Sequence, residues 1–238
     1  MLTSRLAGLN DRLPTQSIRN WRQNGRARGL YNNMNQKVPL QERLDATFLT
    51  SAPDLKHCPR DDVPEVAFAG RSNAGKSSVL NTITGNRRMA KVSKTPGRTQ
   101  LLNLFDLASG GRLVDLPGYG YAKAGKTAQA KWQQSVNTYL SKRDNLVGLV
   151  LVTDIRHPKQ PYDEELIRWS AASELPIRVL LNKADKLSSA AGQRAESAFK
   201  KNYPDHPCLS VQRFSALKGT GNNALIEHIR GWLAGNPE

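Results

Sequence analysis

Short apolar runs alternate with amphipathic stretches of helical length from Val63 onward, and no other feature of the sequence restricts the fold as much. This alternation is typical of βαβ units around a mainly parallel sheet, so it predicts an α/β fold. The pair Gly110-Gly111 separates two apolar runs and predicts a hairpin, which would make one edge strand antiparallel. The expected strands are 64–69, 100–107, 112–115, 146–153, 176–182 and 208–213, and the expected helices are 76–84, 128–142, 161–173, 190–202 and 220–233.

A chain of 238 residues has room for one domain with extensions, given about 100 to 200 residues per domain. Residues 1–34 are rich in Arg, Asn, Gln and Gly, and they predict a basic, disordered amino-terminal extension in which Met34 offers an alternative start of translation. We interpret residues 35–62 as a lead-in segment with Phe48 and Leu49 as candidate anchors, and residues 63–234 as the domain itself.

The charge balance is strongly basic, with a formal net charge of +15. Such a field favours polyanionic partners such as nucleic acid or acidic membrane surfaces. No apolar run approaches the roughly 18 residues that span a bilayer, and the only cysteines, Cys58 and Cys208, form no CxxC arrangement. We therefore expect a cytoplasmic protein without membrane insertion, a disulfide framework or a cysteine metal site.

The segment Gly70–Ser77, with the sequence GRSNAGKS, follows an apolar run and leads into a helical stretch, which is the context that a Walker A loop requires. Its glycines let several backbone N–H groups face one anion, and the amino end of the helix adds its dipole. Lys76 is predicted to reach the β and γ phosphates, and the Ser77 hydroxyl to ligate Mg²⁺ directly. The predicted phosphate-binding residues are Gly70, Arg71, Ser72, Asn73, Ala74, Gly75, Lys76, Ser77 and Ser78.

A second motif, DLPG, comes at the carboxyl end of a predicted strand, where nucleotide sites form in α/β sheets. Asp115 is expected to hold a magnesium-bound water, and the Gly118 amide to sense the γ-phosphate. Leu116 and Pro117 complete this predicted part of the site. Taken alone, the string also fits an ordinary turn.

The sequence NKAD follows the apolar run 177–181 and predicts recognition of the base. An Asp carboxylate accepts hydrogen bonds from guanine N1–H and N2–H₂, which adenine lacks, so Asp185 would select GTP over ATP. In isolation, Asp185 also fits a helix N-cap. Asn182 is predicted to tie the loops together, and the stem of Lys183 to cover the ring. Ser215 and Ala216 would direct backbone N–H groups toward guanine O6. Ala184 and Phe214 complete the predicted nucleotide-binding residues of this part of the site.

Residues 85–98 are polar and basic without a core pattern, and TPGRT at 95–99 predicts a mobile switch. Such a loop must supply a hydroxyl that reaches Mg²⁺ only when the γ-phosphate is present, and Thr99 is the predicted direct ligand. Gly97 and Arg98 are predicted to bind the nucleotide beside it. The basic residues of this loop fit either a solvated loop or a contact surface for RNA; they are Arg87, Arg88, Lys91 and Lys94.

Tyr119 occupies the position after Asp-x-x-Gly where a Ras-like GTPase has a water-orienting Gln. No side chain is assigned as catalytic base, so we expect slow intrinsic turnover, with Lys76, Thr99 and Gly118 supporting the transition state. The amide oxygen of Asn73 is a candidate ligand for a K⁺ ion that acts in place of an arginine finger. The alternative is that Asn73 only braces the loop.

Four segments together resemble the EngB family, also called YihA or YsxC, among the GTPases related to Era, EngA, TrmE and the septins. They are GRSNAGKSS at 70–78, SKTPGRTQ at 93–100, DLPGYGYA at 115–122 and FSA at 214–216. The resemblance covers roughly residues 40–234, and it departs from the family at Asn182, where Thr is usual. It implies a single Ras-like P-loop GTPase domain with a six-stranded, mostly parallel sheet and helices on both faces.

The resemblance also implies a role in assembling the large ribosomal subunit, with GTP-dependent docking on the rRNA or proteins of a precursor particle, and a need for it in cell division and septation. The expected ligands are GTP or GDP with Mg²⁺, and the expected state is a monomer. Lys142-Arg143 and Lys200-Lys201 are either rRNA contacts or solvated helix ends. The rival hypothesis is a nucleotide-dependent binding switch in cell division that recruits protein partners with little intrinsic hydrolysis.

Overall fold

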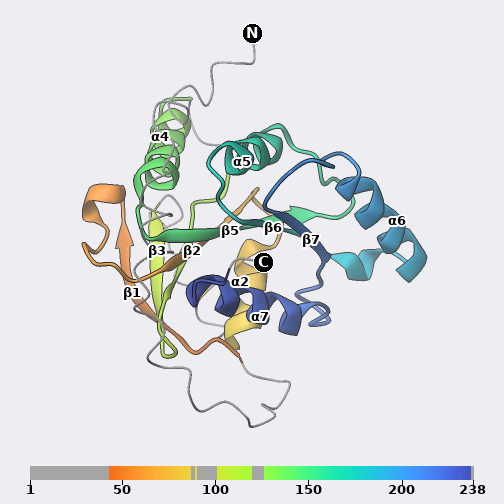
Figure 1. The fold of residues 1–238 in the computed structure, drawn as a ribbon, viewed down its shortest axis with the longest axis horizontal. Coiled ribbons are helices and arrows are strands. Elements are labelled where there is room, and N and C mark those ends of the chain that lie inside the picture. The colour runs from red at the N-terminus through yellow and green to blue at the C-terminus, as the bar shows by residue number, and fades with distance from the viewer. Residues whose placement is uncertain (1–42, 87–88, 90–100, 120–125, 237–238) are drawn as a thin grey trace.

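The computed structural model describes residues 43–86, 89, 101–119 and 126–236. Within them, seven strands form one sheet in the order β1-β3-β4-β2-β5-β6-β7, with helices on both faces (Figure 1), which confirms the predicted α/β fold. The strands are β1 (Ala46–Ala52), β2 (Glu65–Gly70), β3 (Leu102–Leu107), β4 (Arg112–Asp115), β5 (Leu146–Asp154), β6 (Ile177–Asn182) and β7 (Leu209–Arg213). The helices are α2 (Lys76–Thr84), α4 (Lys126–Lys142), α5 (Pro161–Ala172), α6 (Ser189–Lys200) and α7 (Asn222–Leu233), with short 3₁₀ turns η2 (Leu55–His57) and η3 (Ala184–Lys186).

The sheet is parallel except at β3, which runs antiparallel to both of its neighbours. The predicted hairpin joins β3 to β4, and Gly110 and Gly111 occupy it with φ of 90° and 87°, a region that residues with a Cβ rarely adopt. The Leu107 amide closes the turn by donating to the Gly111 carbonyl at 3.0 Å. The prediction that the reversed strand lies at the edge is wrong, because β1 pairs with the outer side of β3.

Strand β1 also corrects the prediction of six strands. Only Ala46 and Ala52, at its two ends, are buried, so the sequence shows no clear alternation. Its pairing with β3 shifts register between Phe48 and Thr50, which leaves Leu49 in a bulge and 42% exposed. Phe48 meets the Phe105 ring edge-on at 5.7 Å, so it is the one of the two candidate anchors that packs against the sheet.

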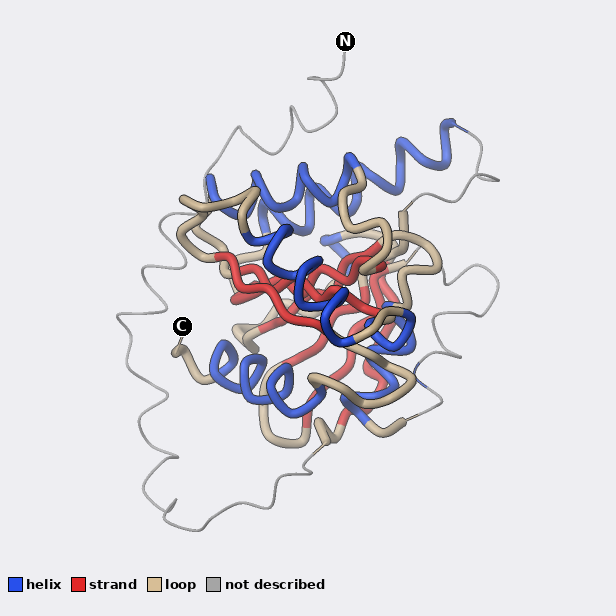
Figure 2. Tube along the Cα trace, turned by 90° about the vertical axis from the view of Figure 1, so that its right-hand side faces the viewer, coloured by secondary structure: helices blue, strands red, loops and turns tan. Residues whose placement is uncertain are grey.

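Two hydrophobic clusters lie on opposite faces of the sheet. Helices α4, α5 and α6 cover one face and α2 and α7 the other, so that the strands lie between two layers of helices (Figure 2). Ala67 and Ala69 of β2 point into the first cluster, and Val66 and Phe68 into the second. Because both faces are covered, the central strands are continuous apolar runs rather than alternating ones.

The helix ends follow local chemistry, and the predicted elements match within two residues at each end. Pro161 opens α5 with its fixed φ, and Asp163 and Glu164 lie in the first turn, where acidic groups complement the helix dipole. The Ser188 hydroxyl caps α6 by accepting from the Ala191 amide at 3.3 Å.

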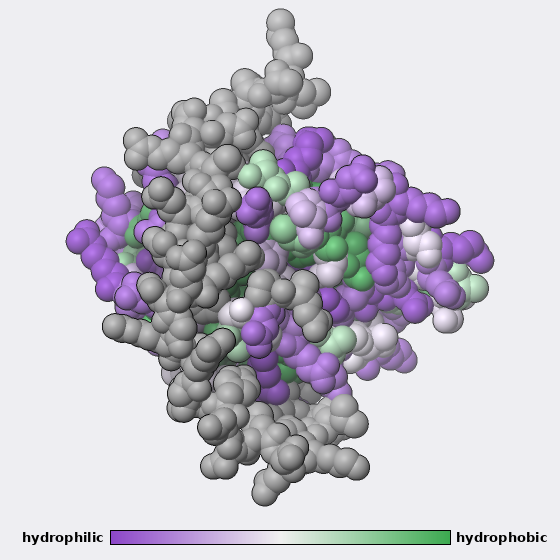
Figure 3. Space-filling view, in the orientation of Figure 1, coloured by the Kyte–Doolittle hydropathy of each residue, from purple (hydrophilic) through white to green (hydrophobic). Residues whose placement is uncertain are grey.

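On the face shown in Figure 3, hydrophilic residues form most of the described surface. None of the described helices combines the length and hydropathy needed to cross a membrane.

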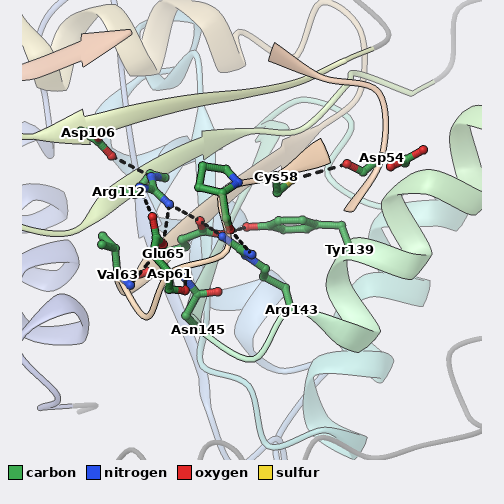
Figure 4. A network of polar contacts seen from close by, with 11 residues as sticks. Asp54, Cys58, Asp61, Val63, Glu65, Asp106, Arg112, Tyr139, Arg143 and Asn145 are labelled. Atoms are coloured by element: carbon green, nitrogen blue, oxygen red, sulfur yellow. Dashed lines mark hydrogen bonds and ion pairs between the residues drawn. The ribbon is translucent and has the colours of Figure 1, made fainter. Parts of the chain in front are cut away.

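A buried ion network closes the amino-terminal edge of the sheet (Figure 4). Glu65, at the start of β2, has no exposed surface. It accepts hydrogen bonds from Arg112 of β4 at 3.0 Å, from the Tyr139 hydroxyl at 2.8 Å and from Arg143 at 2.6 and 2.8 Å. Burial raises the pKa of Tyr139 well above its usual value, so its hydroxyl remains a donor. The network joins β2, β4 and the carboxyl end of α4 at the edge opposite the candidate site.

Candidate nucleotide-binding site

A cavity of about 440 Å³ opens at the carboxyl edge of the parallel strands. This is the edge where open α/β sheets bind ligands, and the volume lies within the range of small-molecule sites. The cavity brings together residues from the loop after β2, from β3, from the segment after β4 and from the end of β6. Its lining is Arg71, Ser72, Asn73, Gly75, Lys76, Ser77, Ser78, Asn103, Asp115, Leu116, Pro117, Gly118 and Lys183.

The loop between β2 and α2 turns sharply to reach the cavity. Asn73 and Gly75 have positive φ values of 68° and 99°, and Gly75 immediately precedes α2. The Lys76 ammonium forms an ion pair with the Asp115 carboxylate at the end of β4, and both side chains are buried. The loop thus places a cation and the Ser77 hydroxyl at the amino end of one helix, where the dipole favours an anion, and β4 brings the Asp115 carboxylate beside them.

Asn182, at the end of β6, holds two loops with one side chain. Its Nδ2 donates to the Ala74 carbonyl at 2.8 Å, and its Oδ1 accepts from the Ala216 amide at 3.3 Å. Asn182 is only 1% exposed, so neither contact competes with bulk water. The loop after β2 and the loop after β7 are therefore fixed relative to each other.

Lys183 is fixed in the same way, and it lines the cavity. Its ammonium donates to the Asn73 carbonyl at 2.7 Å and to the Asp154 carboxylate at 2.9 Å. The hydrogen bond from Arg156, which has the largest effect, and the hydrogen bond from Lys183 hold the pKa of Asp154 well below its usual range. Sequence reasoning missed Asp154, although an acidic residue that ends an apolar strand is a usable signal.

The carboxylate of Asp185 is oriented by the loop after β7. Ser215 donates its hydroxyl to Asp185 Oδ1 at 2.6 Å, and this bond lowers the pKa of Asp185. The carboxylate therefore stays ionised and keeps acceptor capacity at neutral pH. Ala184 donates its amide to the Phe214 carbonyl at 3.0 Å, which joins the same two loops. These residues do not line the cavity, but they adjoin it through Lys183.

Asn103 of β3 is a cavity residue that sequence reasoning missed. It is 2% exposed and pairs in register with Asp115 across β3 and β4. Ser51 of β1 donates its hydroxyl to Asn103 Oδ1 at 2.7 Å. A lone Asn within the apolar run 101–105 was the available signal. The predicted switch residues Gly97, Arg98 and Thr99, and the basic residues Arg87, Arg88, Lys91 and Lys94, lie outside the described residues.

Tyr119 lies beside the cavity without lining it. Its side chain is buried, at 6% exposure, and its hydroxyl donates to the carboxylate of Asp163 in α5. The residue that stands where a water-orienting Gln would be expected thus points into the protein interior.

Comparison with known proteins identifies the family of the chain. Residues 65–183 match the family described as "50S ribosome-binding GTPase". The chain is 50% identical over 193 residues to "Probable GTP-binding protein EngB" of Enterobacter sp. (strain 638), and the match covers 79% of this chain and 91% of that protein. The chain belongs to the EngB family of GTPases.

Other EngB proteins support the same assignment. The EngB protein of Aeromonas salmonicida (strain A449) is also 50% identical over 193 residues, which is 80% of this chain and 89% of that protein. A crystal structure of "a probable GTP-binding protein engB" has the same fold, with a TM-score of 0.60 and 22% identity, and it aligns with 71% of this chain and 98% of its own. As an EngB-family member with a P-loop, the protein is a GTP-binding enzyme that hydrolyses GTP.

Proposed function

We propose that this EngB-family GTPase is a GTP-driven switch in the assembly of the large ribosomal subunit, needed for normal cell division and septation. The match to a family described as 50S ribosome-binding GTPases carries this proposal. GTP orders the loops next to the phosphates, the ordered form docks on the precursor particle, and hydrolysis releases it.

The charge of the protein supports a partner rich in phosphate. The formal net charge is +15, and Lys and Arg contacts to phosphates give strong, salt-sensitive binding. Arg143 of the pair Lys142-Arg143 is bound to Glu65, and its side chain is only 9% exposed. Lys200-Lys201 are both exposed on the α6 side, together with Arg194. We therefore place the rRNA contact on the α6 side.

We assign the cavity to the phosphates and Asp185 to guanine. Ser77 and Asp115 line the same cavity, and their oxygen donors suit Mg²⁺, with Asp115 acting through a water. Thr99 is the proposed second direct ligand. When bound, Mg²⁺ neutralises charge that develops on the phosphate oxygens. Lys76 would then interact with the β and γ phosphates, and Gly118 with the γ-phosphate.

We also propose that Asn73 helps to hold a K⁺ ion. Its position in the cavity lining supports this role. Its carbonyl accepts from Lys183 at 2.7 Å, so the residue braces the loop through its backbone, and we assign its side-chain amide oxygen to the ion.

We propose that the protein acts in the cytoplasm as a monomer. Cys58 and Cys208 are not joined in a disulfide, as a reducing compartment allows. Residues 1–34 would be a basic extension and residues 35–62 a lead-in to the GTPase domain at 63–234. The pairing of β1 with β3 supports treating the lead-in as part of the folded unit.

The test is GTP hydrolysis by the purified protein, with and without large ribosomal subunits, in equimolar KCl and NaCl. We expect stimulation by the subunits and a faster rate in KCl, both lost in Lys76→Ala. Tight GTP binding without stimulation by the subunits would contradict the proposal and favour a binding switch that recruits division proteins. Equal rates in the two salts would contradict the K⁺ assignment alone.

A further inference from the structure

Tyr119 contacts two separate elements, the phosphate-binding loop and helix α5. Its carbonyl accepts from the Ser72 amide at 2.7 Å, and it forms a parallel bridge with Arg71 in the phosphate-binding loop. Its hydroxyl donates to Asp163 Oδ1 in the first turn of α5. The residue that follows Gly118 is therefore held by its backbone to one element and by its side chain to another.

The Tyr119–Asp163 pair is buried. Asp163 is 1% exposed, and the Tyr119 and Tyr162 ring centroids are 4.7 Å apart. Burial raises the pKa of the Asp163 carboxyl to about 6, against the lowering effect of hydrogen bonds with Tyr119, Thr153 and the Gln160 backbone. Burying a carboxylate costs free energy relative to an apolar side chain of similar size, so stability alone is a weak explanation for the pair.

The backbone next to the pair lies in van der Waals contact with the phosphate-binding loop. A Cβ on Gly118 would lie 3.6 Å from the Gly70 carbonyl oxygen and 3.7 Å from the Ser72 amide nitrogen, both in the phosphate-binding loop. Gly118 itself lines the cavity. The backbone direction at Tyr119 therefore affects the orientation of the Gly118 peptide.

We propose that Tyr119 and Asp163 are positioning residues for GTP hydrolysis. The contact between their side chains holds the Gly118 peptide against the phosphate-binding loop. The proposal rests on the assignment of the cavity to the phosphates. Without the hydroxyl contact, Gly118 populates orientations that do not meet the γ-phosphate. Only the competent fraction of molecules then reacts, so kcat falls. Affinity for GDP is retained, because Lys76 and Asp185 still bind the parts that GDP and GTP share.

The variants for the test are Tyr119→Phe, Asp163→Ala and Asp163→Asn. Tyr119→Phe keeps the ring packing and removes only the donor, whereas Asp163→Asn keeps an oxygen that accepts from Tyr119. Tyr139→Phe is the matched control, because it also removes a buried tyrosine hydroxyl from a carboxylate, 2.8 Å from Glu65 (Figure 4). Glu65 and the phosphate-binding loop lie at opposite ends of β2, about 17 Å apart at the rise of a strand.

The measurements are kcat and KM for GTP in KCl, the dissociation constant of a fluorescent GDP, and Tm. We expect Tyr119→Phe and Asp163→Ala each to lower kcat about tenfold, with GDP affinity within about twofold of wild type. Their double variant should be no slower than either single variant, since the two residues act as one unit. Asp163→Asn should keep most of the wild-type kcat. Tyr139→Phe should lower Tm and leave kcat unchanged.

Three results would overturn the proposal: a wild-type kcat in Tyr119→Phe, the same loss of kcat in Tyr139→Phe, or additive losses in the double variant. Each is measured on intrinsic turnover without ribosomal subunits. Failure of the ribosomal role therefore leaves this test intact. A wild-type protein that bound no GDP would instead refute the assignment of the cavity.

Discussion

Replacing Glu65 by Gln tests the ion network at the amino-terminal edge of the sheet. Glu65 is fully buried and accepts four hydrogen bonds, three of them from guanidinium groups. Gln removes the negative charge and turns an NH₂ group toward those donors. Arg112 keeps its pairs with Asp61 and Asp106, but Arg143 loses its one carboxylate partner among the described residues and keeps the Pro59 carbonyl at 2.9 Å.

The expected cost follows from these remaining contacts. Removing one partner of a buried ion pair destabilises a protein by about 3 to 5 kcal/mol. Because Arg112 retains two carboxylates, we expect the lower end, about 3 kcal/mol in the free energy of unfolding. For a chain of this size, that loss lowers Tm by roughly 6 to 12 °C.

Urea unfolding and calorimetry at neutral pH would measure the loss. Asp106→Asn is the control: the side chain of Asp106 is 45% exposed, so its ion pair with Arg112 should contribute less than about 1 kcal/mol. GDP affinity should be unchanged in both variants, because the network lies at the opposite end of β2 from the cavity. A loss below about 1 kcal/mol in Glu65→Gln would refute the reasoning.

Two further predictions concern Gly75 and His228. In Gly75→Ala, at a φ of 99°, the new Cβ would lie 2.3 Å from Asn182 Nδ2, so the Asn182 amide would lose its hydrogen bond to the Ala74 carbonyl. Urea unfolding should show that the free energy of unfolding falls by about 2 to 4 kcal/mol, and GDP should bind more weakly. Unchanged values would contradict the described loop. Burial, with a smaller effect of Arg178, lowers the pKa of His228 to about 4 from 6.5. The folded state then binds fewer protons than the unfolded state between these values, so this contribution to stability is present above about pH 6.5 and is lost as the pH falls toward 4. His228→Gln should therefore lose less unfolding free energy than wild type between pH 7 and 5, and equal losses would show that His228 does not contribute.

Much of the fold could be predicted from local patterns. The helices carry a clear periodicity and the central strands are continuous apolar runs, and the hairpin at Gly110-Gly111 needs positive φ values that Gly adopts without strain. Strand β1 could not be found in this way, because only its two end residues are buried and the pairing with β3 stabilises the rest. The position of β3, next to the edge rather than at it, depends on that same long-range pairing.

The sequence by itself determined the fold class and predicted the phosphate-binding loop, because apolar runs, helical periodicity and the eight residues from Gly70 to Ser77 are local properties of the chain. Tertiary structure alone decided which distant side chains meet. Ser51 reaches Asn103, Asp154 holds Lys183, and Asp163 receives the Tyr119 hydroxyl. These partners lie between 29 and 52 residues apart in the chain. Their contacts arise only when the strands assemble and the helices pack on the sheet, which no local pattern encodes.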